Sequence, residues 1–287
     1  MKIISTLLIV SISFTASAQK AQKKKANTSG PAPDTQVVYK TIGDVELKLH
    51  IFNPEGHQVG NQTPAIVFFF GGGWTGGTPR QFYPHSEYLA SRGMVAISAE
   101  YRVAKTHKTS PQECVKDGKS AVRWIRANAK RLGIDPNKLA AGGGSAGGHV
   151  AAATGTVSGF NEQGEDTSVS CIPNALVLFN PVYNNGPGGY GHDRVKDYWE
   201  AFSPFHNIHK LTPPTIAFFG SEDPLITVKE TEEYKAKMVA LGIRSDLHVY
   251  EGEKHGFFNK SKYNETVLEA DKFLADLGFL KGTPTIQ

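Results

Sequence analysis

Short, uninterrupted runs of apolar residues recur along the chain, and helix-like segments separate them. A strand that is buried on both faces of a sheet has such a run, whereas a strand with one wet face alternates. Alternation of strands and helices predicts a mainly parallel sheet flanked by helices, which is an α/β fold. We expect the buried strands at Ala65–Phe70, Met94–Ala99, Leu139–Ala141, Ala175–Phe179 and Thr215–Phe219, with a weaker one at Asp246–Tyr250.

The remaining segments have other periodicities. Val45–Phe52 alternates apolar and polar residues, which predicts a half-buried strand that pairs antiparallel with Gln36–Lys40. Gln112–Leu132 has a helical period, and Gly133 after it predicts a C-terminal cap. Further helices are predicted at Gln81–Ser91, Val228–Leu241 and Asn264–Leu277.

Two long polar stretches, residues 158–170 and 183–206, follow neither pattern. Long loops in compact domains are often functional. The second stretch is rich in Gly, Asn, Tyr and His, so we consider it a lid or substrate wall, with a surface insertion as the equal alternative. We predict one catalytic domain over residues 36–281, followed by a tail over residues 282–287.

The first 18 residues have the pattern of a secretory signal peptide. Lys2 precedes the mostly apolar run Ile3–Val10, and Ala16–Ala18 fits a small-x-small cleavage site. The apolar run is short for a membrane span and is followed by serines and a threonine. We therefore expect cleavage after Ala18, a secreted or periplasmic protein, and no stable membrane insertion after cleavage.

The net charge of +4 comes from the N-terminal region. Five lysines precede residue 26, whereas Asp34 is the single acidic residue before Val37, so the chain from Val37 onward carries 26 basic and 26 acidic residues. A neutral domain gives no support for a nucleic-acid partner. Residues 19–35 are rich in Lys, Ala, Pro, Ser and Gly, which predicts a flexible linker.

The cysteine content restricts metal chemistry. Cys114 and Cys171 are the only two cysteines, too few for a Cys-rich zinc or iron–sulfur site, and no H-E-x-x-H motif occurs. We therefore expect neither a metal nor a cofactor. In an oxidising compartment the two cysteines form one disulfide or remain two buried thiols, and the sequence leaves both alternatives open.

The segment Gly143–Gly147 matches G-x-S-x-G and lies between a predicted strand and an apolar helix. This context predicts a nucleophile elbow, in which a sharp turn raises Ser145 above the carboxyl edge of the sheet. The residues two before and two after the serine must be very small. The first N–H groups of the helix then face the substrate and favour a developing negative charge.

A serine nucleophile needs a base and an orienting acid. Asp223 follows the predicted strand Thr215–Phe219, and His255 follows the weaker strand Asp246–Tyr250. Parallel strands bring such positions to one sheet edge, so we predict a Ser145–His255–Asp223 triad. Glu222 is the rival acid.

A glycine run, Gly71–Gly73, directly follows the strand Ala65–Phe70, and Trp74 comes next. Glycines let backbone N–H groups approach a substrate oxygen. We predict an oxyanion hole from the N–H groups of Gly72, Gly73 and Ala146.

These motifs together resemble the α/β-hydrolase family, in particular its hormone-sensitive-lipase-like and bacterial ferulate/acetyl-esterase branches. The resemblance covers about residues 37–280 and implies an eight-stranded sheet and metal-free acyl transfer. Those branches usually have a histidine before the glycine run, where this chain has Phe70. That histidine is thought to brace the oxyanion loop, so the bracing must differ here. The motifs are Gly71–Trp74, Ala99–Arg102, Ser120–Arg126, Gly144–His149, Gly220 with Asp223–Pro224, and His255–Phe257.

Four other residues lie near these motifs. Trp74 is either a wall of the acyl pocket or a packing residue. His149, one turn after the nucleophile, is either a substrate contact or, as we favour, a structural histidine. Tyr101 and Arg102 follow a strand near the same edge and are predicted to be structural.

Both glycine loops also match the dinucleotide fingerprint G-x-G-x-x-G, and Glu100 ends the strand after the first loop. We reject a nucleotide site because it would leave Ser145, Asp223 and His255 unexplained. A catalytically inactive binding module is disfavoured because the complete triad is present.

We expect a secreted serine esterase that removes short acyl groups, acetyl or feruloyl, from polysaccharide or oligosaccharide. The branch resemblance and the predicted export favour this substrate class, and no apolar run indicates a lipid tunnel. The alternatives are a general carboxylesterase or lipase acting on small esters, and a peptidase of the prolyl-oligopeptidase type.

Overall fold

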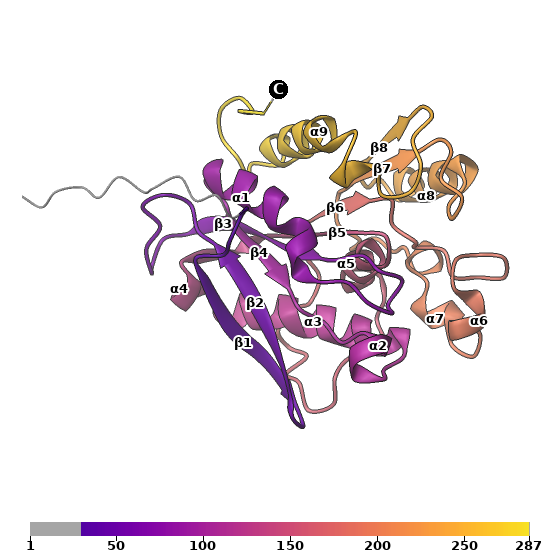
Figure 1. The fold of residues 1–287 in the computed structure, drawn as a ribbon, viewed down its shortest axis with the longest axis horizontal. Helices are drawn as coiled ribbons and strands as arrows, with labels where there is room; N and C mark the ends of the chain where they lie inside the picture. Colours follow the sequence, from indigo (N-terminus) through magenta and orange to yellow (C-terminus); the bar gives the residue numbers. More distant parts are fainter. Residues whose placement is uncertain (1–29, 287) are drawn as a thin grey trace, which may run out of the picture. The chain divides into compact units, whose positions relative to one another are not determined.

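One eight-stranded sheet organises the chain (Figure 1). The computed structural model describes residues 30–286, so the predicted signal peptide (1–18) and most of the predicted linker (19–35) lie outside the described residues. The strand order is β1-β2-β4-β3-β5-β6-β7-β8. The strands are β1 (Thr35–Ile42), β2 (Val45–Phe52), β3 (Thr63–Phe69), β4 (Val95–Ala99), β5 (Ile134–Gly144), β6 (Ala175–Phe179), β7 (Thr215–Gly220) and β8 (Ser245–Tyr250).

The sheet is antiparallel only at its beginning. β1 pairs with β2 and β2 with β4 in antiparallel fashion, whereas the five pairings from β4 through β3 to β8 are parallel. The carboxyl ends of β3, β5, β6, β7 and β8 therefore meet at one edge. This topology confirms the predicted α/β-hydrolase architecture.

Helices cover both faces of the sheet. The longer helices are α1 (Tyr83–Ser91), α3 (Pro111–Ala127), α5 (Ala146–Thr156), α8 (Val228–Ala240) and α9 (Tyr263–Asp276). The short ones are η1 (Pro79–Phe82), α2 (Ala104–His107), α4 (Ala129–Leu132), α6 (His192–Val195), α7 (Trp199–Phe202), η2 (Pro204–His206) and η3 (Phe257–Asn259).

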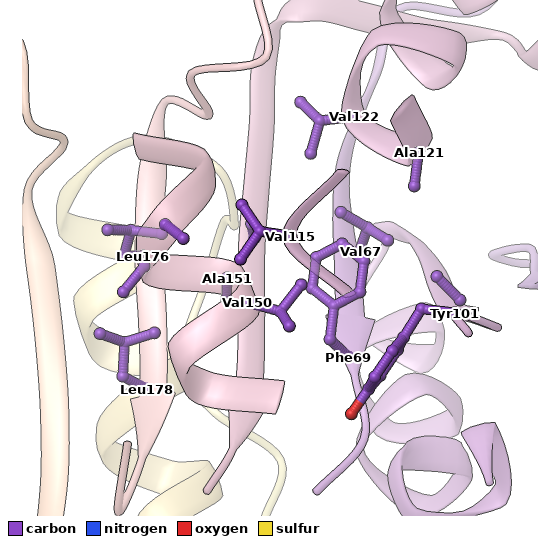
Figure 2. Close-up of a cluster of buried hydrophobic side chains, with 14 of the residues drawn as sticks. Val67, Phe69, Tyr101, Val115, Ala121, Val122, Val150, Ala151, Leu176 and Leu178 are labelled. Atoms are coloured by element: carbon purple, nitrogen blue, oxygen red, sulfur yellow. The ribbon is translucent and has the colours of Figure 1, made fainter. Parts of the chain in front are cut away.

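Two hydrophobic layers lie on either side of the sheet. Alternate residues of β3 point to opposite layers: Val67 and Phe69 belong to the layer under α3, α5 and α8, and Phe68 belongs to the layer under α1 and α9. Figure 2 shows the first layer, in which Val115 of α3 and Val150 of α5 pack toward Phe69 and Val67. Burial on both faces explains why these strands have continuous apolar sequences.

The structure corrects two predicted segments. The predicted helix Gln112–Leu132 is two helices, α3 and α4, because the chain departs from helical geometry at Asn128. The second helix ends at Gly133 with φ 66°, as the predicted cap requires. The polar stretch 183–206 contains α6, α7 and η2, each too short to produce a detectable sequence period.

Residues on both sides of the predicted domain, 36–281, also form contacts with it. Asp34 and Thr35, at the end of the predicted linker, are joined to the sheet: the Asp34 N–H donates to Ile51 O at 2.8 Å, and Thr35 begins β1. In the predicted tail, the carbonyl of Gly282 accepts a hydrogen bond from Arg92 at 3.1 Å.

Both cysteines are buried free thiols. The Cys114 Sγ donates to Arg102 O and the Cys171 Sγ to Thr154 O, so each thiol has its own partner in the core. Among the described residues, no helix is long and apolar enough to cross a membrane.

Candidate active site

Ser145 occupies the sharp turn between β5 and α5. Its backbone has φ 55° and ψ −122°, a conformation that L-residues rarely adopt and that is often found at functional sites. A side chain at Gly147 would lie 2.1 Å from Phe69 O, so only glycine fits there. The Ser145 N–H donates to Phe179 O at 2.9 Å, which ties the turn to the neighbouring strand β6. This geometry is that of a nucleophile elbow.

The structure brings Ser145, His255 and Asp223 together. His255 Nε2 lies 2.8 Å from Ser145 Oγ, and His255 Nδ1 lies 2.7 Å from Asp223 Oδ2. The Asp223 side chain is buried, and its other oxygen accepts the Leu225 N–H at 2.8 Å. The rival acid Glu222 is exposed, and within the described part of the chain its carboxylate forms no hydrogen bond with His255.

Asn180 is a fourth polar residue in this site, and it belongs to no motif of the sequence analysis. It directly follows β6, is fully buried and has φ 35°. Its Oδ1 accepts the Gly256 N–H at 3.0 Å, and its Nδ2 lies 3.3 Å from His255 Nε2. Its position after a parallel strand is the one signal that could have identified it.

The three predicted oxyanion donors lie at the start of α5 and in the loop after β3. Ala146 is the first residue of α5, where a backbone N–H has no partner within the helix. Within residues 30–286, the N–H groups of Gly72, Gly73 and Ala146 donate no hydrogen bond. The site therefore combines free N–H donors with a serine hydroxyl next to an imidazole.

The loop after β3 is braced without the histidine of the resembling families. Phe70, which takes its place, stacks on Tyr101 with ring centroids 4.1 Å apart. The Tyr101 hydroxyl donates to Phe70 O at 2.5 Å, and the Gly71 N–H donates to Gln81 Oε1 at 2.5 Å. A tyrosine that follows β4 and a glutamine from η1 thus fix the beginning of the loop.

Trp74 and His149 lie behind this loop. Both are buried, with 1 % and 0 % of their surface exposed, and their rings meet edge to face at 5.1 Å. Burial in this aromatic cluster lowers the pKa of His149 to about 3. In this conformation neither ring offers surface to a substrate, which favours the packing role for Trp74 and the structural role for His149 over substrate contacts.

Arg102 has a structural environment. Its guanidinium donates to both oxygens of the buried Asp117 at 2.8 Å and to Glu162 at 2.8 Å, and Lys40 bonds the same two acids. This ion cluster ties β1 to α3 and to residues 158–170.

Glu230, on the first turn of α8, is a titratable group near Asp223. Burial, the neighbouring Glu233 and the charge of Asp223 raise its pKa to about 7, and a hydrogen bond with Asn184 acts in the opposite direction. The described residues contain no group of three or more His, Cys, Asp or Glu side chains that could hold a metal ion.

Two protein families match the chain in succession. The BD-FAE family matches residues 49–175, and the dienelactone hydrolase family matches residues 174–280. Among curated proteins, esterase LipC of Mycobacterium tuberculosis is 29 % identical over 68 % of this chain, and an acetylxylan esterase of Xylanibacter ruminicola is 26 % identical over 96 %. The chain spans 53 % and 54 % of the lengths of these two relatives.

A solved structure gives closer agreement over the whole domain. Esterase 2 of Thermogutta terrifontis is 40 % identical, with a TM-score of 0.81 over 87 % of this chain and 96 % of that one. Structures of that enzyme include one phosphorylated by paraoxon. The shared fold, the level of identity and the two family matches show that the chain belongs to the α/β-hydrolase serine esterases of the hormone-sensitive-lipase-like and BD-FAE type.

Proposed function

We propose that this chain is a serine esterase that removes short acyl groups, acetyl or feruloyl, from polysaccharides or oligosaccharides. The proposal rests on one observation. The Ser145 hydroxyl lies 2.8 Å from His255 Nε2, beside a loop in which the Gly72 and Gly73 N–H groups donate no hydrogen bond within the described residues. We propose a serine nucleophile, a histidine base and a set of oxyanion donors, which is what acyl transfer requires.

In the proposed reaction, His255 Nε2 takes the proton of Ser145 as Oγ attacks the ester carbonyl. Asp223 holds the imidazole through Nδ1 and stabilises its charged form. The oxyanion accepts hydrogen bonds from the N–H groups of Gly72, Gly73 and Ala146. His255 then gives its proton to the departing alcohol, and a water molecule, deprotonated by the same imidazole, releases the carboxylic acid from Ser145.

The substrate class has three kinds of support. Solved structures of the Thermogutta terrifontis esterase contain propionate and butyrate, which are short acyl products. The acetylxylan esterase match extends over 96 % of this chain. The signal-like residues 1–18 add a reason for export, since a polymer substrate lies outside the cell.

The test compares polymer and small-ester substrates. We would measure acetate and ferulate release from acetylated xylan and feruloylated arabinoxylan, alongside p-nitrophenyl acetate, butyrate and octanoate, with Ser145→Ala as the control. Polymer or oligosaccharide turnover at rates comparable to p-nitrophenyl acetate, lost in Ser145→Ala, is the expected result. Full esterase turnover in Ser145→Ala would refute the mechanism.

Three other outcomes select the alternatives. Turnover of the nitrophenyl esters alone indicates a general carboxylesterase, and a preference for octanoate indicates a lipase-like acyl pocket. Cleavage of a prolyl peptide substrate, without ester preference, indicates a prolyl-oligopeptidase-type peptidase. Each of these results excludes the carbohydrate substrate while retaining Ser145 as the nucleophile.

A further inference from the structure

The middle of the oxyanion loop has a strained backbone conformation. Gly72, Gly73 and Trp74 have φ values of 131°, 64° and 58°, so three consecutive residues lie at positive φ. Trp74 carries a large side chain in this left-handed region, where only glycine is free of strain. Such a conformation persists only where the surrounding structure enforces it.

The two ends of the loop are fixed by contacts from neighbouring elements. Tyr101 and Gln81 hold its beginning, as described above. At its far end, the carbonyls of Trp74 and Thr75 accept the backbone N–H groups of Ala104 and Lys105 at 3.0 and 2.9 Å. Within the loop, the Thr75 and Gly76 N–H groups donate to Gly72 O at 3.0 and 3.1 Å and hold the Gly72–Gly73 peptide, which carries the proposed donor Gly73 N–H. None of these backbone contacts reaches the next peptide, Gly73–Trp74.

Arg194 of α6 holds this middle position. Its Nη1 donates to Gly73 O at 2.6 Å, and its guanidinium carbon lies 4.9 Å from the Trp74 ring centre and 5.3 Å from that of Tyr190. The Thr75 hydroxyl also donates to Gly73 O, at 3.2 Å. The guanidinium is both closer and charged, so its hydrogen bond is the stronger of the two.

The segment 183–206 fixes Arg194 relative to the nucleophile. The Val182 N–H donates to Ser145 O at 3.3 Å, and Asn185 Nδ2 bonds the carbonyls of Val182 and Tyr190 at 3.3 and 2.9 Å. The chain from the nucleophile turn to α6 is thus linked by hydrogen bonds. Through Arg194, this segment forms a hydrogen bond with the backbone of the glycine run.

We propose that Arg194 is a positioning residue for the oxyanion hole. By fixing the Gly73 carbonyl and covering the Trp74 ring, it holds the Gly73–Trp74 peptide and thereby the backbone dihedrals of Gly73, so that the adjoining peptides keep the Gly73 and Gly72 N–H groups directed toward the carbonyl oxygen above Ser145. Rotation of the peptide groups next to Gly73 would turn these donors away. The proposal rests on the proposed ester hydrolysis and assigns a role in it to the segment 183–206.

The experiment compares Arg194→Gln with Arg194→Lys and with Lys196→Gln. Lys196 is exposed, lies two residues further on and carries the same charge, so its variant controls for a general loss of positive charge. We expect Arg194→Gln to lower kcat on p-nitrophenyl acetate about 10- to 100-fold with little change in KM, less than the roughly 10²–10³-fold loss of a whole donor. Arg194→Lys should be intermediate, and Lys196→Gln should match the unmodified chain.

Two further readouts separate positioning from a structural or substrate-binding role. The inhibition constant of a boronic acid, which forms a tetrahedral adduct with Ser145 Oγ, should rise by the same factor as kcat falls, at an unchanged melting temperature. A rise in KM alone, equal losses in Arg194→Gln and Lys196→Gln, or an undiminished kcat in Arg194→Gln would overturn the proposal. Should Arg194→Gln not fold, the comparison of Arg194→Lys with Lys196→Gln decides.

Phosphorylation of Ser145 by paraoxon, followed by mass spectrometry, keeps this proposal distinct from the proposed function. This phosphorylation requires the nucleophile and the oxyanion hole but does not require ester turnover. Slower phosphorylation in Arg194→Gln supports the role of Arg194 even if no ester is hydrolysed. Equal phosphorylation rates reject that role even if the unmodified chain is an active esterase.

Discussion

Asn180 lies against His255: its Nδ2 is 3.3 Å from His255 Nε2, and its Oδ1 accepts the Gly256 N–H at 3.0 Å. Asn180 therefore contacts the ring and the backbone that follows it. We expect Asn180→Ala to lower kcat by about 5- to 30-fold, because losing a buried hydrogen bond costs about 1–2 kcal/mol and about 1.4 kcal/mol is tenfold in rate. Steady-state kinetics on p-nitrophenyl acetate checks this, and an unchanged kcat contradicts it.

The two neighbouring acids Asp223 and Glu222 have different surroundings, so their variants should differ. Asp223 is buried against His255, whereas Glu222 is exposed. Asp223→Asn should lower kcat by about 10⁴-fold, because an amide favours the wrong imidazole tautomer. Glu222→Gln is the matched control and should leave kcat within about twofold. A large loss in Glu222→Gln with an active Asp223→Asn would reverse the assignment.

Glu230 should make the stability of the fold depend on pH. Burial, Glu233 and Asp223 raise the pKa of Glu230 from 4.5 to about 7. Between these two pH values the folded chain therefore keeps a proton that the unfolded chain releases. Stability from this group is therefore present below about pH 4.5 and is lost as pH rises to about 7. Glu230→Gln should raise the melting temperature at pH 8 and leave it unchanged at pH 4. Equal shifts at both pH values would contradict this.

His85 is a buried histidine without a hydrogen-bond partner for either ring nitrogen among the described residues. Its ring packs on Phe82 and Tyr263, both at 4.9 Å, and burial lowers its pKa to about 3. The unfolded chain takes up a proton below about pH 6.5, so this group destabilises the fold increasingly as pH falls toward 3.

His85→Phe should therefore stabilise the protein. Removing an unpaired buried polar group is worth about 1–3 kcal/mol, and each kcal/mol shifts the melting temperature of a domain of this size by about 2–4 °C. Thermal unfolding at pH 5 and pH 8 is the measurement, and the gain should be larger at pH 5. A lower melting temperature at both pH values would mean that the larger ring overpacks the site.

The sequence predicted those parts of the fold that depend on local pattern. The continuous apolar runs located β3 to β7, and the G-x-S-x-G spacing located the turn at Ser145, because both patterns follow from steric requirements of the elements themselves. The break at Asn128 was missed because α4 continues the helical period of α3 after one non-helical residue.

The residues that escaped prediction depend on contacts between distant segments. Arg194 lies 121 residues from Gly73, and Asn180 lies 75 residues from His255. An arginine in a polar stretch and an asparagine after a strand are common, and only the folded chain distinguishes these two. Phe70 was recognised as a departure, but its partner Tyr101 became apparent only from the stacking.

The parallel sheet also affects when the site forms during folding. Ser145 and His255 are 110 residues apart, and His255 is carried by the connection after β8, the strand at the sheet edge. Contacts between residues so far apart form late, because a long loop must close before they contribute. During refolding, ester turnover should therefore recover only after this last strand has docked, later than the helical signal, so that regained activity reports completion of the entire sheet.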